Sequence, residues 1–181
     1  TTEIRRRLIA GGIVRDDRTL RLALWWTGKA RSLQAGEYRF DHAMTPLAVI
    51  DKIVNGDVYT LQITFPEGLT IEEMARIYES RGFGSARDFV AAASDESAVR
   101  SLDPMAGDLE GYLFPETYAL PRRAPASQLI RLMVNRFLAT YDEKARAAAE
   151  AQGLTARQVV TLASLVEKET AQAEERPIVA A

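Results

Sequence analysis

The sequence predicts an α+β fold that is mostly helical and contains one small pair of strands. Apolar residues recur at intervals of three and four over most of the chain, which is the period of an amphipathic helix. Residues 58–65 instead alternate and are rich in β-branched and aromatic side chains, as strands are. Apolar residues make up 47% and charged residues 27% of the 181 residues, close to the globular average, so general disorder is excluded.

In the first half of the chain, glycines, prolines and capping residues mark where helices begin and end. The glycine pair at residues 11–12 ends a first helix, and Thr45 followed by Pro46 opens another. Thr70 and Glu73 have the spacing of a capping box, and so do Thr155 and Gln158 in the second half. We expect helices over residues 1–10, 17–26, 46–54, 71–81 and from 85 onward, and a strand pair formed by residues 37–41 and 58–65.

The second half is predicted to be helical apart from one extended segment. Residues 95–107 are polar and small, and they mark the best boundary between two regions, 1–103 and 104–181. A weak similarity between residues 3–13 and 73–83 suggests two related submodules in the first region, although chance similarity between amphipathic helices explains it equally well. Beyond the boundary we expect an extended segment over 111–120, then helices over 127–141, up to 152, and over 156–170.

The residue counts exclude several kinds of chemistry. Cysteine is absent and histidine occurs once, as His42 in a turn-like context, so thiol catalysis, Cys or His zinc sites and Ser-His-Asp triads lack their required groups. The 23 basic and 25 acidic side chains give a net charge of -2, which argues against a nucleic-acid partner. No segment approaches the roughly 20 apolar residues of a membrane-spanning helix. Any catalysis is expected to rest on carboxylates, tyrosines, hydroxyls or backbone groups, with no metal and no cofactor.

Residues 109–118 form the first segment that could carry chemistry. They combine large apolar and aromatic residues with two carboxylates, a glycine and a proline, which suits neither a helix nor a regular strand. Aromatic faces cover the C–H faces of sugars and carboxylates accept hydrogen bonds from hydroxyls, so the segment could line a carbohydrate groove. Composition alone favours the simpler interpretation, a loop whose aromatic rings pack in the core.

The second segment is the helix that includes residues 163–170. Its spacing places Glu169 on one flank of the predicted buried stripe, Glu167 on the opposite flank, and Lys168 pointing away. A carboxylate beside an apolar wall loses hydration, which raises its pKa and suits a general acid. The alternative, favoured by spacing alone, is that both glutamates are ordinary surface residues. The predicted buried stripe consists of Val159, Leu162, Ala163 and Val166.

At these two segments the sequence resembles the MltG (YceG-like) family of endolytic murein transglycosylases. The pattern E-G-Y-L-F-P-[DE]-T-Y matches residues 110–118, and A-S-[IL]-[VI]-E-K-E-T matches residues 163–170. Residues 35–40 and 65–75 also resemble that family, and the latter stretch is similar to a LysM-like, glycan-binding submodule. The resemblance implies a small LysM-like α/β region over 1–103, followed by a helical catalytic region that is truncated here.

The resemblance also implies an activity and a place in the cell. Members cleave the β-1,4 bond between N-acetylmuramic acid and N-acetylglucosamine without water, leave a 1,6-anhydro-muramyl end, and terminate or release nascent strands near penicillin-binding synthases. The family is anchored in the cytoplasmic (inner) membrane by a single span and faces the periplasm and cell wall. We expect that span before residue 1 and more of the catalytic domain after residue 181, which leaves open whether this chain is active by itself.

The implied mechanism needs one glutamic acid, which protonates the leaving oxygen and then accepts the proton of the muramyl 6-hydroxyl. The resemblance and the helix-face argument place Glu169 first, with Glu167 as the supporting or alternative catalytic residue. The different-class alternative is a non-catalytic, LysM-like glycan-binding or scaffold protein of the wall-synthesis machinery. The resemblance carries over four further residues as substrate-binding candidates: Glu110, Tyr112, Glu116 and Tyr118.

Overall fold

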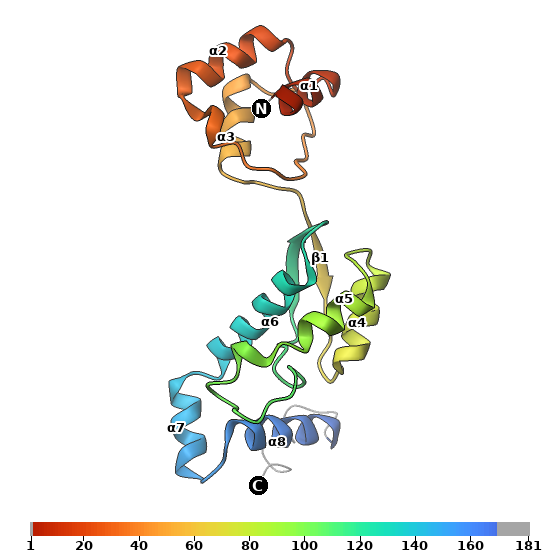
Figure 1. Cartoon of the computed structure of the whole chain (residues 1–181), viewed down its shortest axis with the longest axis vertical. Coiled ribbons are helices and arrows are strands. Elements are labelled where there is room, and N and C mark those ends of the chain that lie inside the picture. Colours follow the sequence, from red (N-terminus) through yellow and green to blue (C-terminus); the bar gives the residue numbers. More distant parts are fainter. Residues whose placement is uncertain (1, 170–181) are drawn as a thin grey trace. The chain divides into compact units, whose positions relative to one another are not determined.

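The computed structural model describes residues 2–169, and contacts divide the chain into two compact units, residues 1–61 (unit 1) and 62–181 (unit 2). Both units are mostly helical, and the sheet formed within residues 2–169 has two strands (Figure 1). The predicted fold class, α+β and mostly helical, is therefore confirmed. Among these residues no helix is both long enough and apolar enough to cross a membrane.

Unit 1 is built from three α-helices and a short 3-10 helix. The second and third helices begin at capping side chains: Asp16 accepts a hydrogen bond from the Thr19 amide at 2.9 Å, and Thr45 accepts one from the Ala48 amide at 3.4 Å. The predicted helices are thus confirmed in this unit. They are α1 (Thr2–Ala10), α2 (Asp17–Thr27), η1 (Lys29–Arg31) and α3 (Pro46–Val54).

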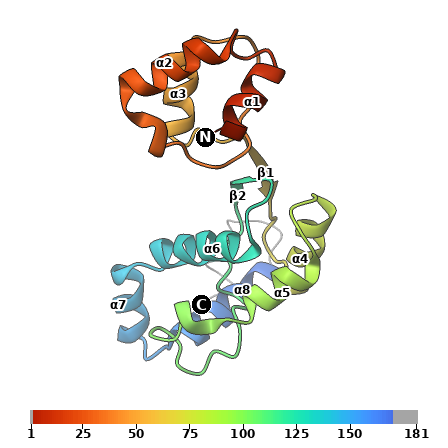
Figure 2. The ribbon, with the colours of Figure 1, turned by 45° about the horizontal axis from the view of Figure 1, so that its top comes forward.

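One apolar core holds unit 1 together. Leu20 and Leu24 lie four residues apart, so they share the inner face of α2, and both are almost fully buried. Helix α3 lies beside α2 and contributes Val49, Ile50 and Ile53 (Figure 2). All buried members of this cluster come from unit 1.

The observed strand pairing differs from the predicted one. The expected strand before residue 65 is confirmed as β1 (Thr60–Thr64), but its partner is β2 (Thr117–Pro121) and not residues 37–41. The latter segment contacts Tyr59, just before β1: the Tyr59 amide donates to the Glu37 carbonyl at 2.6 Å, and the Arg39 guanidinium lies over the Tyr59 ring at 5.7 Å. Residues 37–41 nevertheless form no strand ladder. Alternation identified a strand, but it carries no information on which distant segment pairs with it.

The register of the sheet follows from two contacts. The hydroxyl oxygens of Thr64 and Thr117 lie 2.8 Å apart, and the Phe65 amide donates to the Glu116 carbonyl at 3.1 Å. The end of β1 therefore meets the start of β2, so the strands are antiparallel. The 52 residues between them hold the first helices of unit 2 and the extended segment around residues 110–115.

Five α-helices and one short 3-10 helix complete unit 2 over its described residues. Both predicted capping boxes are confirmed: Thr70 and Glu73 exchange hydrogen bonds at 2.9 and 3.3 Å, and Thr155 and Gln158 do so at 2.8 and 3.3 Å. The helices are α4 (Ile71–Ser80), α5 (Ala86–Ala93), η2 (Glu96–Ala98), α6 (Ala126–Thr140), α7 (Glu143–Ala151) and α8 (Ala156–Glu169).

The core of unit 2 lies where α4, α5, α6 and the sheet meet. Phe65 and Phe89 are almost completely buried, with ring centroids 6.1 Å apart, and the Tyr78 ring lies tilted against Phe89 with centroids 5.4 Å apart. Helix α5 packs against both α4 and α6. This packing fixes the chain on either side of residues 110–115.

The contacts place the division between compact units at residues 61–62, whereas composition marked residue 103 as the boundary. Residues 95–107 are polar, but they are not a loose linker. Val99 and Asp103 are buried, and the Leu109 amide donates to the Ala93 carbonyl at 2.9 Å. Polar composition therefore marked a loop that folds back into unit 2. The division into a LysM-like region and a catalytic region stays a prediction.

The predicted internal similarity has a structural counterpart at two helix ends. Gly12 and Gly82, 70 residues apart in sequence, have φ of 68° and 75°. In each case the next residue donates its amide to a carbonyl five residues earlier, that of Leu8 at 3.0 Å and that of Tyr78 at 3.3 Å. This is a common way to end a helix, so it does not decide between duplication and chance.

Candidate active site

A groove in unit 2 brings the two sequence segments together. Its volume is about 340 Å³, within the usual range of ligand pockets. It is lined by residues 68–70, Met74 of α4, the extended segment around 110–115, Phe137 of α6 and, from α8, mainly one helix face together with Leu165. Its surface combines apolar side chains with carboxylates, hydroxyls and one ammonium group.

The face of α8 that lines this groove is not the predicted one. Val160, Ala163, Ser164, Glu167 and Lys168 follow the three- and four-residue spacing of one helix face, and all of them line the groove. Lys168 is exposed, as its predicted direction away from the buried stripe implies, although it also lines the groove.

The predicted buried stripe is wrong for most of its members. Leu162 is 40% exposed, Ala163 is exposed and Val159 is half-buried, so only Val166 is buried as predicted. The only other buried residue of α8 is Ala156, at its first turn. The helix thus turns a small and partly polar face toward the rest of unit 2.

Glu167 is the α8 carboxylate that reaches the groove. Its side chain is half-buried, and its Oε1 would lie 3.3 Å from a Cβ atom added to Gly68. Gly68 has φ of 76°, a left-handed conformation that glycine adopts without strain. The turn before α4 therefore brings its backbone close to this carboxylate because it has no side chain there.

A second glycine lets the extended segment lie directly on α8. Gly111 has φ of 83°, and a Cβ atom at this position would come within 2.6 Å of Val160 Cγ1. Real Cβ atoms essentially never approach another atom so closely, so any larger residue would push the segment away from the helix. The glycine of the E-G-Y pattern thus closes one side of the groove.

Glu110, predicted to bind substrate, lines the groove but already has a partner. Its Oε2 accepts a hydrogen bond from the Ile71 amide at 2.9 Å, at the first residue of α4. That amide has no acceptor within its own helix, and the positive end of the helix dipole favours a carboxylate there. Glu110 therefore ties the extended segment to α4 and leaves one carboxylate oxygen without a bond in this contact.

Tyr112, also predicted to bind substrate, is buried behind the groove. Its hydroxyl donates to Asp103 Oδ2 at 2.7 Å, and Arg157 Nε donates to the same oxygen at 2.8 Å. The Met105 amide donates to Asp103 Oδ1 at 3.1 Å. Burial by itself would raise the pKa of Asp103, but the bonds from Tyr112, Arg157 and the amide outweigh it and hold the pKa below its usual value. Burial and the neighbouring carboxylate raise the pKa of Tyr112.

This cluster was not predicted, and it connects both sequence segments. Asp103 is 6% exposed, whereas Arg157 lies half-exposed on the first turn of α8. The carboxylate therefore fixes the start of α8 relative to the extended segment that contains Tyr112. The sequence marks Asp103 only as one acidic residue in a loop of small residues. Its burial in the structure is what reveals its role in fixing the start of α8.

The last two substrate-binding candidates make local contacts. The Tyr118 hydroxyl donates to the Phe114 carbonyl at 2.7 Å, and burial raises the pKa of Tyr118 to about 12. Glu116 is exposed and pairs with Arg136 at 2.8 Å. Neither lines the groove. Their assignment to substrate binding stays a prediction, and the geometry gives each a structural contact instead.

Glu169, the first choice for the catalytic residue, does not line the groove. It is the last residue of α8, and its side chain is exposed. Apolar neighbours on α8 are expected to shield this carboxyl group from water. That expectation is wrong, because Leu162 and Leu165 are themselves exposed. Its catalytic role stays a prediction. Thr170, which completes the matched pattern, lies outside the described residues.

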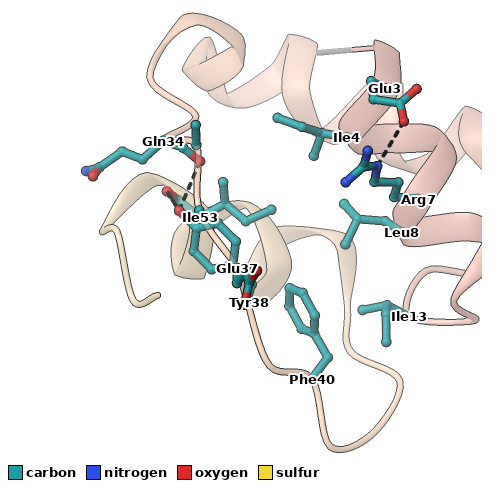
Figure 3. Close-up of a pocket in the computed structure, with 12 residues that line it drawn as sticks. Glu3, Ile4, Arg7, Leu8, Ile13, Gln34, Glu37, Tyr38, Phe40 and Ile53 are labelled. Atoms are coloured by element: carbon teal, nitrogen blue, oxygen red, sulfur yellow. Dashed lines mark hydrogen bonds and ion pairs between the residues drawn. The ribbon is translucent and has the colours of Figure 1, made fainter. Parts of the chain in front are cut away.

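Unit 1 has a larger cavity of its own, about 560 Å³ in volume. Apolar side chains of α1, among them Ile4 and Leu8, face the segment that contains Tyr38 and Phe40 across this cavity (Figure 3). Glu3 and Arg7 pair with each other at its edge at 2.8 Å. The cavity is large enough for a sugar ring and has aromatic walls. The two segments predicted to carry chemistry, residues 109–118 and 163–170, both lie in unit 2.

Comparison with known proteins decides the family. A model of the YceG-like family matches residues 1–181, which is the whole chain. The chain belongs to the YceG-like family. The resemblance noted from residues 110–118 and 163–170 is thereby confirmed.

Similar proteins agree with this membership. The endolytic murein transglycosylase of Bacillus subtilis (strain 168) is 26% identical over 185 residues, which cover 91% of this chain and 49% of that protein. The endolytic murein transglycosylase of Streptococcus pneumoniae serotype 2 is 27% identical over 177 residues, which cover 82% and 31%. This YceG-like chain therefore spans half or less of the length of these relatives.

A solved structure supports the fold. The crystal structure of a yceG-like protein from Listeria monocytogenes matches with a TM-score of 0.55 and 21% identity, covering 96% of this chain and 62% of that one. In the described part of this YceG-like chain, no group of three or more histidine, cysteine or acidic residues is placed to hold a metal ion.

Proposed function

We propose that this YceG-like chain carries part of the active site of an endolytic murein transglycosylase, with Glu167 as its general acid and base. The observation that carries the proposal is the position of Glu167, half-buried in the groove between α8, the extended segment and the turn at Gly68. The names of the similar Bacillus and Streptococcus proteins support the same activity.

The chemistry needs one carboxyl group that changes its protonation state twice. Protonated Glu167 gives its proton to the glycosidic oxygen as the bond from C1 of N-acetylmuramic acid breaks. The resulting carboxylate accepts the proton of the muramyl 6-hydroxyl, whose oxygen then bonds to C1. The products are a free N-acetylglucosamine 4-hydroxyl and a 1,6-anhydro-muramyl end, and the glutamic acid is regenerated without water.

The remaining groove residues suit substrate positioning. Ser164 and Thr70 offer hydroxyls, Lys168 offers a cation for substrate oxygens, and Phe137 offers an aromatic surface to a sugar ring. Glu110 is already bonded to the Ile71 amide, so it suits positioning better than proton transfer. By family membership we further propose that the full-length protein works at the outer side of the cytoplasmic membrane, beside penicillin-binding synthases.

The test uses the full-length protein, uncross-linked glycan strands and water enriched in heavy oxygen. Mass spectrometry of the new ends should find anhydro-muramyl residues without the label, and Glu167→Gln should lower their rate of formation by about 10²-fold or more. Reducing muramic ends that carry the heavy oxygen would identify a hydrolase and overturn the proposal. Unchanged product formation by Glu167→Gln would overturn the residue assignment.

A second candidate function rests on the cavity of unit 1. We infer that this unit acts as the LysM-like glycan-binding module, because its cavity of about 560 Å³ is lined by aromatic side chains and has charged side chains at its edge. Soluble glycan fragments titrated against the labelled protein should shift amide signals around Tyr38 and Phe40. Shifts confined to the groove of unit 2 would contradict this candidate.

A further inference from the structure

The outer face of α2 exposes an unusual group of large apolar side chains. Leu22 is 63% exposed, Trp25 is 76% exposed and Trp26 is 80% exposed. The helix itself is well packed, because Leu20 and Leu24 on its inner face are almost fully buried. The exposure of the outer side chains is therefore not the result of a loosely packed helix. The chain contains two tryptophans, and both lie in this group.

Two arginines accompany these side chains. Arg18, Leu22 and Trp25 follow one another at four- and three-residue spacing, so they share one helix face, and Arg21 precedes Trp25 by four residues. Arg18 and Arg21 are exposed, and neither forms an ion pair with any residue of the described part of the chain. Helix α2 packs on α1, η1 and α3 through its other side (Figures 1 and 2).

The charge of unit 1 differs in sign from that of the whole chain. Unit 1 contains ten lysines and arginines against seven aspartates and glutamates, although the net charge of the chain is -2. The exposed apolar face therefore lies on the basic part of the protein. A surface that complements it must be acidic and must also accept aliphatic and indole groups.

An anionic phospholipid surface meets both requirements. Tryptophan is enriched at the boundary between headgroups and acyl chains, where its ring is buried and its N–H stays hydrated. Arginine stems extend along such a surface while the guanidinium contacts phosphate. A sugar would use the indole rings but gain little from Leu22, and neither tryptophan lines the cavity of unit 1.

We propose that α2 is an interfacial membrane-binding helix. Leu22, Trp25 and Trp26 enter the boundary region of an anionic phospholipid bilayer, with the helix lying along the surface, and Arg18 and Arg21 contact lipid phosphates. The contact is peripheral and does not span the bilayer.

The test exploits the two tryptophans, because intrinsic fluorescence then reports only on this face. The 181-residue chain is titrated with vesicles of phosphatidylglycerol and phosphatidylcholine, and with vesicles of phosphatidylcholine alone. The expected result is blue-shifted emission and co-sedimentation with the anionic vesicles, weakened by salt. Arg18→Gln and Arg21→Gln should each lower the partition coefficient about fivefold, which follows from about 1 kcal/mol per arginine.

The apolar contribution has its own variants and controls. Trp25→Ser combined with Trp26→Ser should lower co-sedimentation by about tenfold or more, since the buried apolar area carries the affinity. Met105→Ser and Arg122→Gln change exposed residues of unit 2 and should leave binding unchanged. No vesicle binding at low salt, equal binding by all variants, or a fluorescence shift with soluble glycan fragments in place of vesicles would each overturn the proposal.

Discussion

Replacing Asp103 by asparagine tests how the groove is held in shape. The buried carboxylate accepts bonds from the Tyr112 hydroxyl, Arg157 Nε and the Met105 amide, at 2.7, 2.8 and 3.1 Å. Hydrogen bonds to a charged group contribute about 1.5–3 kcal/mol, whereas the ion pair adds little because Arg157 is half-exposed. Asparagine keeps the shape and loses the charge, so we expect unit 2 to lose about 2 kcal/mol of stability.

The assay can separate the two units. Hydrogen exchange at the buried Leu20 and Ile50 reports on unit 1, whose buried core cluster contains no residue of unit 2. Hydrogen exchange at residues around Tyr112 and Arg157 reports on unit 2. Asp103→Asn should speed exchange around Tyr112 and Arg157 and leave exchange at Leu20 and Ile50 nearly unchanged.

A matched control removes a carboxylate charge elsewhere in unit 2. Glu150→Gln changes an exposed side chain of α7. It should alter exchange and unfolding by less than about 0.5 kcal/mol. If Asp103→Asn behaves like this control, the cluster does not stabilise the groove and the reasoning is refuted.

Three further predictions concern Asp103 at low pH and the contacts of Gly111 and Glu110. Since the folded pKa of Asp103 is lowered, its stabilisation is complete above the unfolded pKa of about 3.9 and is lost as pH falls through the folded value, so acid unfolding of Asp103→Asn should be less steep. Gly111→Ala should destabilise unit 2 by about 2 kcal/mol in urea titrations, because residue 111 has a positive φ and lies close to Val160. Adding Val160→Ala should restore part of this stability. Full stability of Gly111→Ala would contradict the close approach. Glu110→Ala should cost about 1 kcal/mol and speed exchange of the Ile71 amide, and unchanged exchange would exclude the capping contact.

Most helices were predictable because their signals are local. Thr70 with Glu73 and Thr155 with Gln158 exchange hydrogen bonds within four residues, so sequence spacing alone identifies both helix starts. The partner of β1 was not predictable in this way. It lies more than 50 residues away, and Pro115 and the aromatic residues before β2 conceal a strand that begins only at residue 117.

The site was predictable in its segments but not in its orientation. Residues of both patterned segments, 110–118 and 163–170, line one groove. On α8, however, Val159, Val160 and Leu162 look equally apolar in sequence, and periodicity cannot tell which of them meets the extended segment. Gly111 decides this, because its missing side chain admits Val160. Selecting that face moves Glu167 into the groove and leaves Glu169 exposed.

The central claim is that the groove face of α8 presents Glu167, not Glu169, to the glycan. The most direct measurement compares the rate of anhydro-muramyl end formation by full-length Glu167→Gln and Glu169→Gln proteins on the same strands. The account predicts that the first variant is slowed by about 10²-fold or more while the second stays within a few-fold of the unaltered protein. The reverse order would contradict it.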